Sequence, residues 1–236
     1  MYIPATSVEI DRIYSQIASQ AVRSIAITAA NSGEGVSSVA VALAQRNLLA
    51  GKSTLLVDLN LYHPNFQHVL DLEKLETTDA SLEQPELISF EQSSIVLTGI
   101  TAPTRREVIL KLRQQAVIEQ CIAKWLETFD TVIIDTSPLN RVNANNIPPE
   151  RIAAACDSCL MVVLAGNSTE SMIDSAVDKL NTSSATILGC VFNDRDNPTL
   201  KNELIRETKR LHPKLAKLGN FLEEWIHKNR LLSLDI

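Results

Sequence analysis

The sequence has little of several residue types that mark particular classes of protein. Aromatic residues make up 4% of its 236 residues, and its four cysteines are Cys121, Cys156, Cys159 and Cys190. No apolar run reaches the roughly 18 residues that suggest a membrane-spanning helix, and the first residues lack the basic and apolar parts of a signal peptide. We therefore expect a cytoplasmic protein with reduced, buried thiols and no disulfide framework.

Cys156 and Cys159 have a CxxC spacing, which zinc sites and redox sites also use. A structural zinc site needs four ligands, and no second pair of candidate ligands lies nearby. A redox pair would lie at the start of a helix that follows a strand, whereas this pair precedes a predicted strand. We interpret both cysteines as structural.

The chain also lacks an excess of basic residues. It has 28 acidic and 22 basic residues, for a net charge of −6 and a pI near 5.3. A general nucleic-acid partner is not expected, because such binding needs a basic face that neutralises phosphates. With 45% hydrophobic residues, the chain has the composition and length of one folded α/β domain.

A lysine is missing from a segment that otherwise has the form of a phosphate-binding loop. Residues 29–40 read AANSGEGVSSVA, and Val36 stands where the GxxxxGK[ST] pattern has its lysine. The segment follows a strand-like run, SIAITA, and opens an apolar helical pattern, which is the context that the motif requires. The sequence therefore predicts a nucleotide-binding loop that lacks its usual positive charge.

The backbone chemistry of this loop does not depend on the lysine. Gly33 and Gly35 allow consecutive N–H groups to turn inward at a helix N-terminus, where an anion is favoured. Ser37 stands where a hydroxyl group would ligate Mg²⁺. The predicted nucleotide-contacting loop is completed by Glu34, Val36 and Ser38. Loss of the lysine is expected to reduce the rate of phosphoryl transfer by a factor of roughly 10²–10³.

Short apolar runs alternate with helical patterns along the chain, which is typical of parallel strands joined by helices. We predict a doubly wound α/β fold with a mostly parallel sheet of about six to eight strands and helices on both faces. The predicted strands are Ser24–Ala29, Ser53–Asp58, Ser94–Thr98, Thr131–Asp135, Cys159–Ala165 and Thr186–Phe192. The predicted helices are Val8–Ala18, Ser37–Leu49, Arg105–Thr128, Pro149–Ala154, Ser168–Asn181, Thr199–Leu211 and Lys214–His227. The stretch from His68 to Glu91 is predicted to be a helix end and a long surface loop.

Two of the predicted strands end in an aspartate. Asp58 closes LLVD and Asp135 closes VIID. Because ligands bind at the carboxyl ends of strands in such sheets, both carboxylates are expected to face the loop. We predict that they are the remnant of a catalytic site and approach Mg²⁺ together with Ser37; the alternative for each is an N-cap or turn aspartate.

Five segments, taken in order, resemble the cytoplasmic ATPase domain of bacterial tyrosine kinases of capsule and exopolysaccharide biosynthesis. They are EIDR, SIAITAANSGEGVSSVAVALA, GKSTLLVDLNLYHP, FDTVIIDTSPL and ILGCVFN, within about residues 7–195. That family is part of the deviant-Walker P-loop NTPases, which include the Min and Par ATPases. The resemblance implies a P-loop NTPase fold with ATP or ADP and Mg²⁺ as ligands.

The resemblance also implies roles for residues outside the loop and the two aspartates. Asn193 matches an asparagine that family members place against the nucleotide base. In the N-terminal helix, within residues 1–20, Glu9 and Arg12 match two of three positions of an oligomerisation motif, and Ser15 replaces the third. A homo-oligomer is therefore expected from the resemblance.

The departures from the family are consistent with one another. Val36 replaces the lysine, and Asn60 replaces the second aspartate of the family's DxDxR motif. The chain has only Tyr2, Tyr14 and Tyr62, and its last residues hold no tyrosine cluster of the kind that those kinases phosphorylate. We predict a degenerate member with weak or no phosphoryl transfer. It would act at the inner face of the cell membrane as partner or regulator of an inner-membrane polysaccharide co-polymerase or export protein.

Two alternatives remain open. The first is an active ATPase or protein tyrosine kinase that takes a lysine or arginine from a neighbouring subunit or uses Lys52, although Lys52 begins the second strand at the wrong end of the sheet. The second is a positioning ATPase of the Min or Par type. Residues 212–236 have the spacing of an amphipathic helix, which either docks on this single domain or contacts a membrane surface or a partner.

Overall fold

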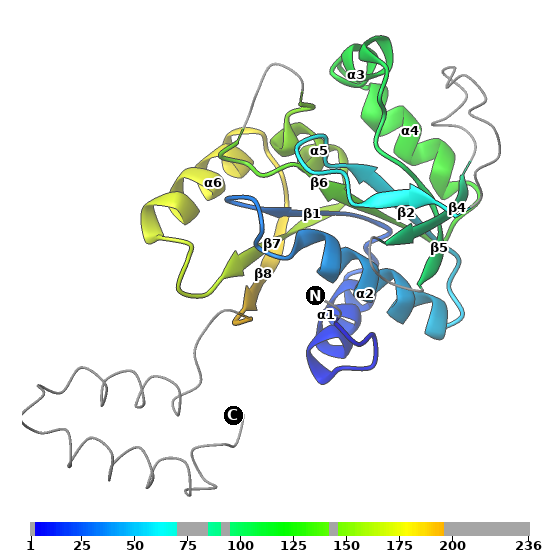
Figure 1. The fold of residues 1–236 in the computed structure, drawn as a ribbon, viewed down its shortest axis with the longest axis horizontal. Helices are drawn as coiled ribbons and strands as arrows, with labels where there is room; N and C mark the ends of the chain where they lie inside the picture. The colour runs from blue at the N-terminus through cyan, green and yellow to red at the C-terminus, as the bar shows by residue number, and fades with distance from the viewer. Residues whose placement is uncertain (1–2, 70–84, 91–94, 142–145, 196–236) are drawn as a thin grey trace, which may run out of the picture. The chain divides into compact units, whose positions relative to one another are not determined.

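The computed structural model describes residues 3–69, 85–90, 95–141 and 146–195 of the chain. The chain divides into two compact units, Met1–Asn193 and Asp194–Ile236. The first unit contains the α/β fold (Figure 1). The helices predicted beyond residue 198, including the amphipathic segment 212–236, lie outside the described residues.

A mostly parallel sheet forms the centre of the first unit. Its eight described strands lie in the order β3-β4-β5-β2-β6-β1-β7-β8. Of the described strand pairs, β3–β4 and β4–β5 are antiparallel and the others are parallel. The strands are Ser24–Ala29 (β1), Thr54–Leu59 (β2), Phe66–His68 (β3), Glu86–Phe90 (β4), Val96–Ile100 (β5), Thr131–Thr136 (β6), Ser158–Leu164 (β7) and Ile187–Asn193 (β8). The predicted α/β class with a mostly parallel sheet is confirmed.

Helices cover both faces of this sheet (Figure 1). Those described are Val8–Ser19 (α1), Val36–Leu49 (α2), Arg106–Leu112 (α3), Val117–Leu126 (α4), Pro149–Ala155 (α5) and Glu170–Thr182 (α6). The first two pack on one face, and the other four pack on the opposite face. The central strands are buried along their whole length, which explains why their sequences are almost continuously apolar.

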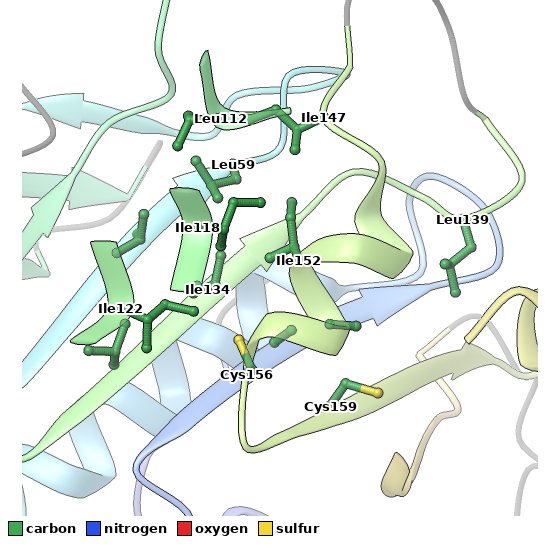
Figure 2. Packing of buried hydrophobic residues seen from close by; sticks show 14 of the residues in the cluster. Leu59, Leu112, Ile118, Ile122, Ile134, Leu139, Ile147, Ile152, Cys156 and Cys159 are labelled. Atoms are coloured by element: carbon green, nitrogen blue, oxygen red, sulfur yellow. The ribbon is translucent and has the colours of Figure 1, made fainter. Parts of the chain in front are cut away.

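Each face of the sheet has its own hydrophobic cluster, because successive side chains of a strand point to opposite faces. In β1, Ile25 and Ile27 join the cluster under α1 and α2, whereas Ala26 joins the other. Figure 2 shows part of this second cluster, where Ile122 of α4 and Ile152 of α5 lie over the sheet.

Cys156 and Cys159 contribute to the same cluster (Figure 2). Burial raises the pKa of the Cys159 thiol to about 11 and raises that of Cys156 well above its ordinary value. Thiols that stay protonated near neutral pH are unreactive. The geometry is therefore consistent with the structural interpretation of the CxxC pair.

Two predictions for the middle of the chain are wrong. The sequence predicts a helix end and a loop from His68 to Glu91, but β3 ends and β4 lies within this stretch, whose residues 70–84 and 91 are outside the described part of the chain. These strands are short, and β4 buries only Ile88, so the alternation that predicts a strand is weak. The predicted helix Arg105–Thr128 is divided into α3 and α4, because Ala116 adopts a left-handed conformation (φ 65°) that interrupts a right-handed helix.

Candidate functional site

The loop between β1 and α2 turns through two glycines with left-handed backbone conformations. Gly33 has a φ of 81°, and Gly35 has a φ of 103° and is the N-cap of α2. Such φ values are costly for residues with a side chain. The loop therefore directs the first N–H groups of α2 toward the carboxyl edge of the sheet, where an anion is favoured.

Glu34 is fully buried within this loop. Its Oε1 accepts hydrogen bonds from the backbone N–H of Asn31 (3.0 Å) and from Ser168 Oγ (2.9 Å), while its Oε2 has no hydrogen-bond partner. Ser168 lies between β7 and α6. The side chain of Glu34 thus ties the loop to a segment more than 130 residues away in the sequence.

Asn193, at the end of β8, contacts the loop from the neighbouring edge. Its Nδ2 donates to the backbone carbonyl of Glu34 over 2.8 Å. A Cβ atom at Gly35 would lie 2.5 Å from that Nδ2. Asn193 therefore supports the loop itself, whether or not it also contacts a nucleotide base as the resemblance implies.

Val36 does not take over the role of a lysine. Its side chain is half-buried and packs against the cluster under α1 and α2. Lys52 lies before β2, and its Nζ is 5.5 Å from the centre of the Tyr14 ring on α1. The two carboxylates lie at the other end of β2 and of its neighbour β6, so Lys52 does not replace the missing charge.

Asp58 and Asp135 lie side by side on adjacent strands. They are register partners in the β2–β6 pair, and both are fully buried. Ser37 Oγ donates to Asp135 Oδ2 over 2.5 Å. Asp58 accepts backbone N–H groups from Asn60 (2.8 Å) and Asn65 (3.2 Å). The structure thus brings the loop serine and both predicted aspartates together at one point.

Burial controls the ionisation of this pair. It raises the pKa of Asp58 to about 7, against hydrogen bonds from the backbone that lower it. Burial also raises the pKa of Asp135 well above its ordinary value, and the neighbouring Asp58 carboxylate raises it further. Two close carboxylates cannot both ionise at low cost, so the pair favours a proton or a cation between them.

Asn65 belongs to the site but carries no sequence signal. Its Nδ2 donates to Ser37 Oγ over 2.8 Å and to the backbone carbonyl of His63 over 2.9 Å. The residue lies outside every motif, after Pro64 in the connection from β2 to β3. Only the tertiary fold brings it to the loop serine.

The residues present fit a Mg²⁺ ion in part. Ser37, Asp58 and Asp135 offer the hard oxygen ligands that Mg²⁺ prefers, and Asp135 Oδ1 is buried without a hydrogen-bond partner. In the described part of the chain, no group of three or more His, Cys, Asp and Glu side chains is arranged to hold a metal ion. Phosphate and water oxygens would have to complete the coordination.

The predicted oligomerisation residues lie away from this site. Glu9 and Arg12 are exposed on α1, whose observed bounds agree closely with the predicted helix. On a neighbouring part of α1, Asp11 pairs with Arg46 of α2 over 2.7 Å, and Arg46 also lies 4.3 Å above the Tyr14 ring. These contacts hold α1 against α2 and leave the motif residues accessible to solvent.

The fold and the loop define this first unit as a P-loop NTPase-like domain, and comparisons with known proteins narrow the class. No protein-family model matches the chain. It is 28% identical over 181 residues to tyrosine-protein kinase YwqD of Bacillus subtilis, covering 73% of each chain. It is 24% identical over 189 residues to tyrosine-protein kinase CpsD of Streptococcus pneumoniae, covering 77% of this chain and 80% of the relative. The homologues of this chain are thus bacterial tyrosine-protein kinases.

Solved structures agree with this class. The chimerical protein CapA2B2 superposes with a TM-score of 0.59 at 26% identity, covering 77% of this chain and 81% of that one. Cobyrinic acid a,c-diamide synthase from Mycobacterium smegmatis, solved with an ATP analog and magnesium, shares the fold with a TM-score of 0.51 at 18% identity and covers 81% of both chains. Among the helices of the described residues, none is long and apolar enough to span a bilayer.

Proposed function

We propose that this protein holds a nucleotide but transfers its phosphoryl group weakly or not at all. The observation that carries the proposal is the contrast within one loop. Its glycines and Ser37 keep the backbone and oxygen groups that hold phosphate and Mg²⁺, whereas Val36 packs into the core and supplies no charge. ATP or ADP with Mg²⁺ is the proposed ligand. The magnesium-containing structure of the same fold is compatible with this ligand class.

Side-chain hydrogen bonds fix the conformation of the loop, which supports a role in binding a nucleotide. Glu34 is tied to Ser168, and Asn193 is tied to the backbone of the loop. A preorganised set of N–H donors binds an anion without first paying for ordering the loop. Rate enhancement would need an additional group that stabilises charge in the transition state, and the described loop provides none at position 36.

The proposed biological role follows from the homologues. Since these are tyrosine-protein kinases and the resemblance places such kinases in capsule and exopolysaccharide biosynthesis, we assign this chain to that process. It would act on the cytoplasmic side, as a regulator of a membrane chain-length or export protein. Removal of the protein should then change the amount or the length of the surface polysaccharide.

An active tyrosine kinase is the second candidate, because the identified homologues carry that name. In this case a lysine or arginine from a neighbouring subunit would enter the site in place of the missing side chain. The exposed Glu9 and Arg12 on α1 are the proposed contacts for assembly of such an oligomer. A rate of ATP turnover per protein molecule that rises with protein concentration would distinguish this candidate, because it indicates a site completed by a second subunit.

Calorimetric titration with ADP and ATP in the presence of Mg²⁺ tests nucleotide holding. The wild-type protein should bind both. Gly35→Ala should weaken binding, because a side chain is strained at a φ of 103° and the Asn193 amide would have to move away from the loop. Gly51→Ala is the matched control, since Gly51 also has a positive φ (76°) but follows α2 and has open space around its Cβ position. Absence of binding to the wild-type protein would refute the proposal.

A further inference from the structure

Asn65 lies in the β2–β3 connection, and its side chain reaches the hydroxyl group that the proposed site offers to a cation. Its Nδ2 donates to Ser37 Oγ over 2.8 Å, and its backbone N–H donates to Asp58 Oδ2 over 3.2 Å. A third bond, from Nδ2 to the carbonyl of His63, holds the side chain in this orientation. One residue thus contacts two of the three side chains that would supply oxygen ligands.

The Ser37 hydroxyl group has one hydrogen and two lone pairs to share. The hydrogen is donated to Asp135 Oδ2, and one lone pair accepts the Asn65 amide. A hard divalent cation binds such an oxygen through a lone pair. The second lone pair stays open, but the electropositive amide hydrogen would repel a cation bound to the same oxygen, so the two groups compete beside Ser37 Oγ.

The surroundings explain why an electropositive group is favoured there. Asp58 and Asp135 are adjacent and buried, and among the described residues no ion pair neutralises either of them. Asp58 is instead satisfied by backbone N–H groups of Asn60 and Asn65. The β2–β3 connection thereby supplies, from within the chain, the donors that a bound cation would replace.

We propose that Asn65 occupies the cation position of the site and closes it to divalent cations in the nucleotide-free protein. A cation binds only after the Asn65 amide releases Ser37. This inference rests on the proposed nucleotide site and adds to it a positioning residue that governs cation entry. It requires no step of catalysis, so it can be tested with a metal ion alone.

The test is the binding of Mn²⁺ to the nucleotide-free full chain, followed by electron paramagnetic resonance. Asn65→Ala removes the competing amide, and Asn65→Asp replaces it with a carboxylate of the same shape that is itself a ligand. His63→Ala is the matched control, because His63 lies in the same connection and its side chain is exposed. Circular dichroism and the thermal midpoint without Mn²⁺ establish that each variant is folded.

The wild-type protein and His63→Ala should bind Mn²⁺ equally weakly. Asn65→Ala should bind about three- to tenfold more tightly, which corresponds to the loss of one competing hydrogen bond. Asn65→Asp should bind more tightly than Asn65→Ala, and its thermal midpoint should rise more on addition of Mn²⁺ than that of the wild-type protein. If Asn65→Ala does not fold, Asn65→Ser, which also removes the amide without adding a charge, decides the question.

Equal Mn²⁺ affinities for the wild-type protein and Asn65→Ala would overturn the inference, whatever the affinity of Asn65→Asp, because the aspartate adds a ligand of its own. The nucleotide titration gives an independent result. Binding of ADP together with equal Mn²⁺ affinities would refute the role of Asn65 and leave the nucleotide site standing. Tighter Mn²⁺ binding by the variants without any nucleotide binding would refute the proposed function but support the role of Asn65 at the cation position.

Discussion

Gly35 and Asn193 are in direct contact where the loop after β1 meets the end of β8. The missing Cβ of Gly35 leaves the space that Asn193 Nδ2 occupies, and this amide donates to the carbonyl of Glu34. Residues 158 positions apart in the sequence therefore determine the shape of the loop together, before any ligand binds. The same loop keeps its oxygen and N–H groups while it has lost its lysine.

Gly35→Ala should destabilise the protein more than Gly33→Ala. Both substitutions force a residue with a side chain into a positive φ, at a cost of about 1–3 kcal/mol, but only the one at Gly35 adds a collision with Asn193. Urea unfolding measures both values. Combining Gly35→Ala with Asn193→Ala should recover part of the loss, because the second substitution removes the colliding amide. Equal costs at the two glycines would argue against the contact.

Val36→Lys should increase nucleotide affinity and phosphate release. A lysine ammonium group can reach the phosphates, and electrostatic groups of this kind contribute about 10²–10³ in rate where the rest of the site is competent. Val36→Met is the control, because it adds length without charge and keeps an apolar side chain against the core. The account fails if lysine and methionine have the same effect on ATP binding and turnover.

The free energy of unfolding should fall between about pH 5 and pH 7.5 because of the buried aspartates. Burial raises the pKa of Asp58 from 3.8 to about 7 and raises that of Asp135 as well. The folded state thus retains protons that the unfolded state has already lost. This stabilisation is complete below the unfolded pKa and is lost as pH rises through the folded pKa.

Asp58→Asn isolates the contribution of the buried pair to the pH dependence of stability. Unfolding in urea at the two pH values should show a smaller pH dependence in the variant than in the wild-type protein. Asp130, whose pKa is lowered by hydrogen bonds from Ser53, acts in the opposite direction and only at more acidic pH. A wild-type stability that rises with pH over this interval, relative to the variant, would contradict the assignment.

Ser168→Ala should destabilise the conformation of the loop without changing the contacts of Asp58 and Asp135. Ser168 Oγ is a donor to the buried Glu34 carboxylate, and loss of such a donor costs about 1–3 kcal/mol. Ser171→Ala is the control on the adjacent helix, since Ser171 is exposed and its hydroxyl shares a hydrogen bond with Thr169. Hydrogen exchange of the amides of residues 31–37 should accelerate in Ser168→Ala alone. Unchanged exchange there would argue against the proposed tie.

The sequence predicts those parts of the fold in which local pattern and burial agree. The run SIAITA is bounded correctly as β1, and the apolar runs around Asp58 and Asp135 are strands within one residue of the predicted ends. These strands are buried on both faces, so their hydrophobicity is nearly continuous. The edge strand β3 and its neighbour β4 are missed because they are short and partly exposed.

Within the site, the sequence predicts the residues that belong to motifs but not those recruited by the fold. Gly33, Gly35 and Ser37 follow from a recognisable spacing along the chain. Asn65 and Ser168 have no such spacing, because each reaches the loop from a different strand connection. Their roles depend on tertiary contacts, which local propensity does not encode.

The central claim is that the protein holds a nucleotide without turning it over. The most direct test is to measure ATP binding by calorimetry and phosphate release in the same samples with Mg²⁺, using Asp135→Asn to define the background rate. We expect saturable binding and phosphate release that does not exceed this background. Release well above the background that increases with bound ATP would contradict the account and favour an active enzyme with a charge supplied from a neighbouring subunit.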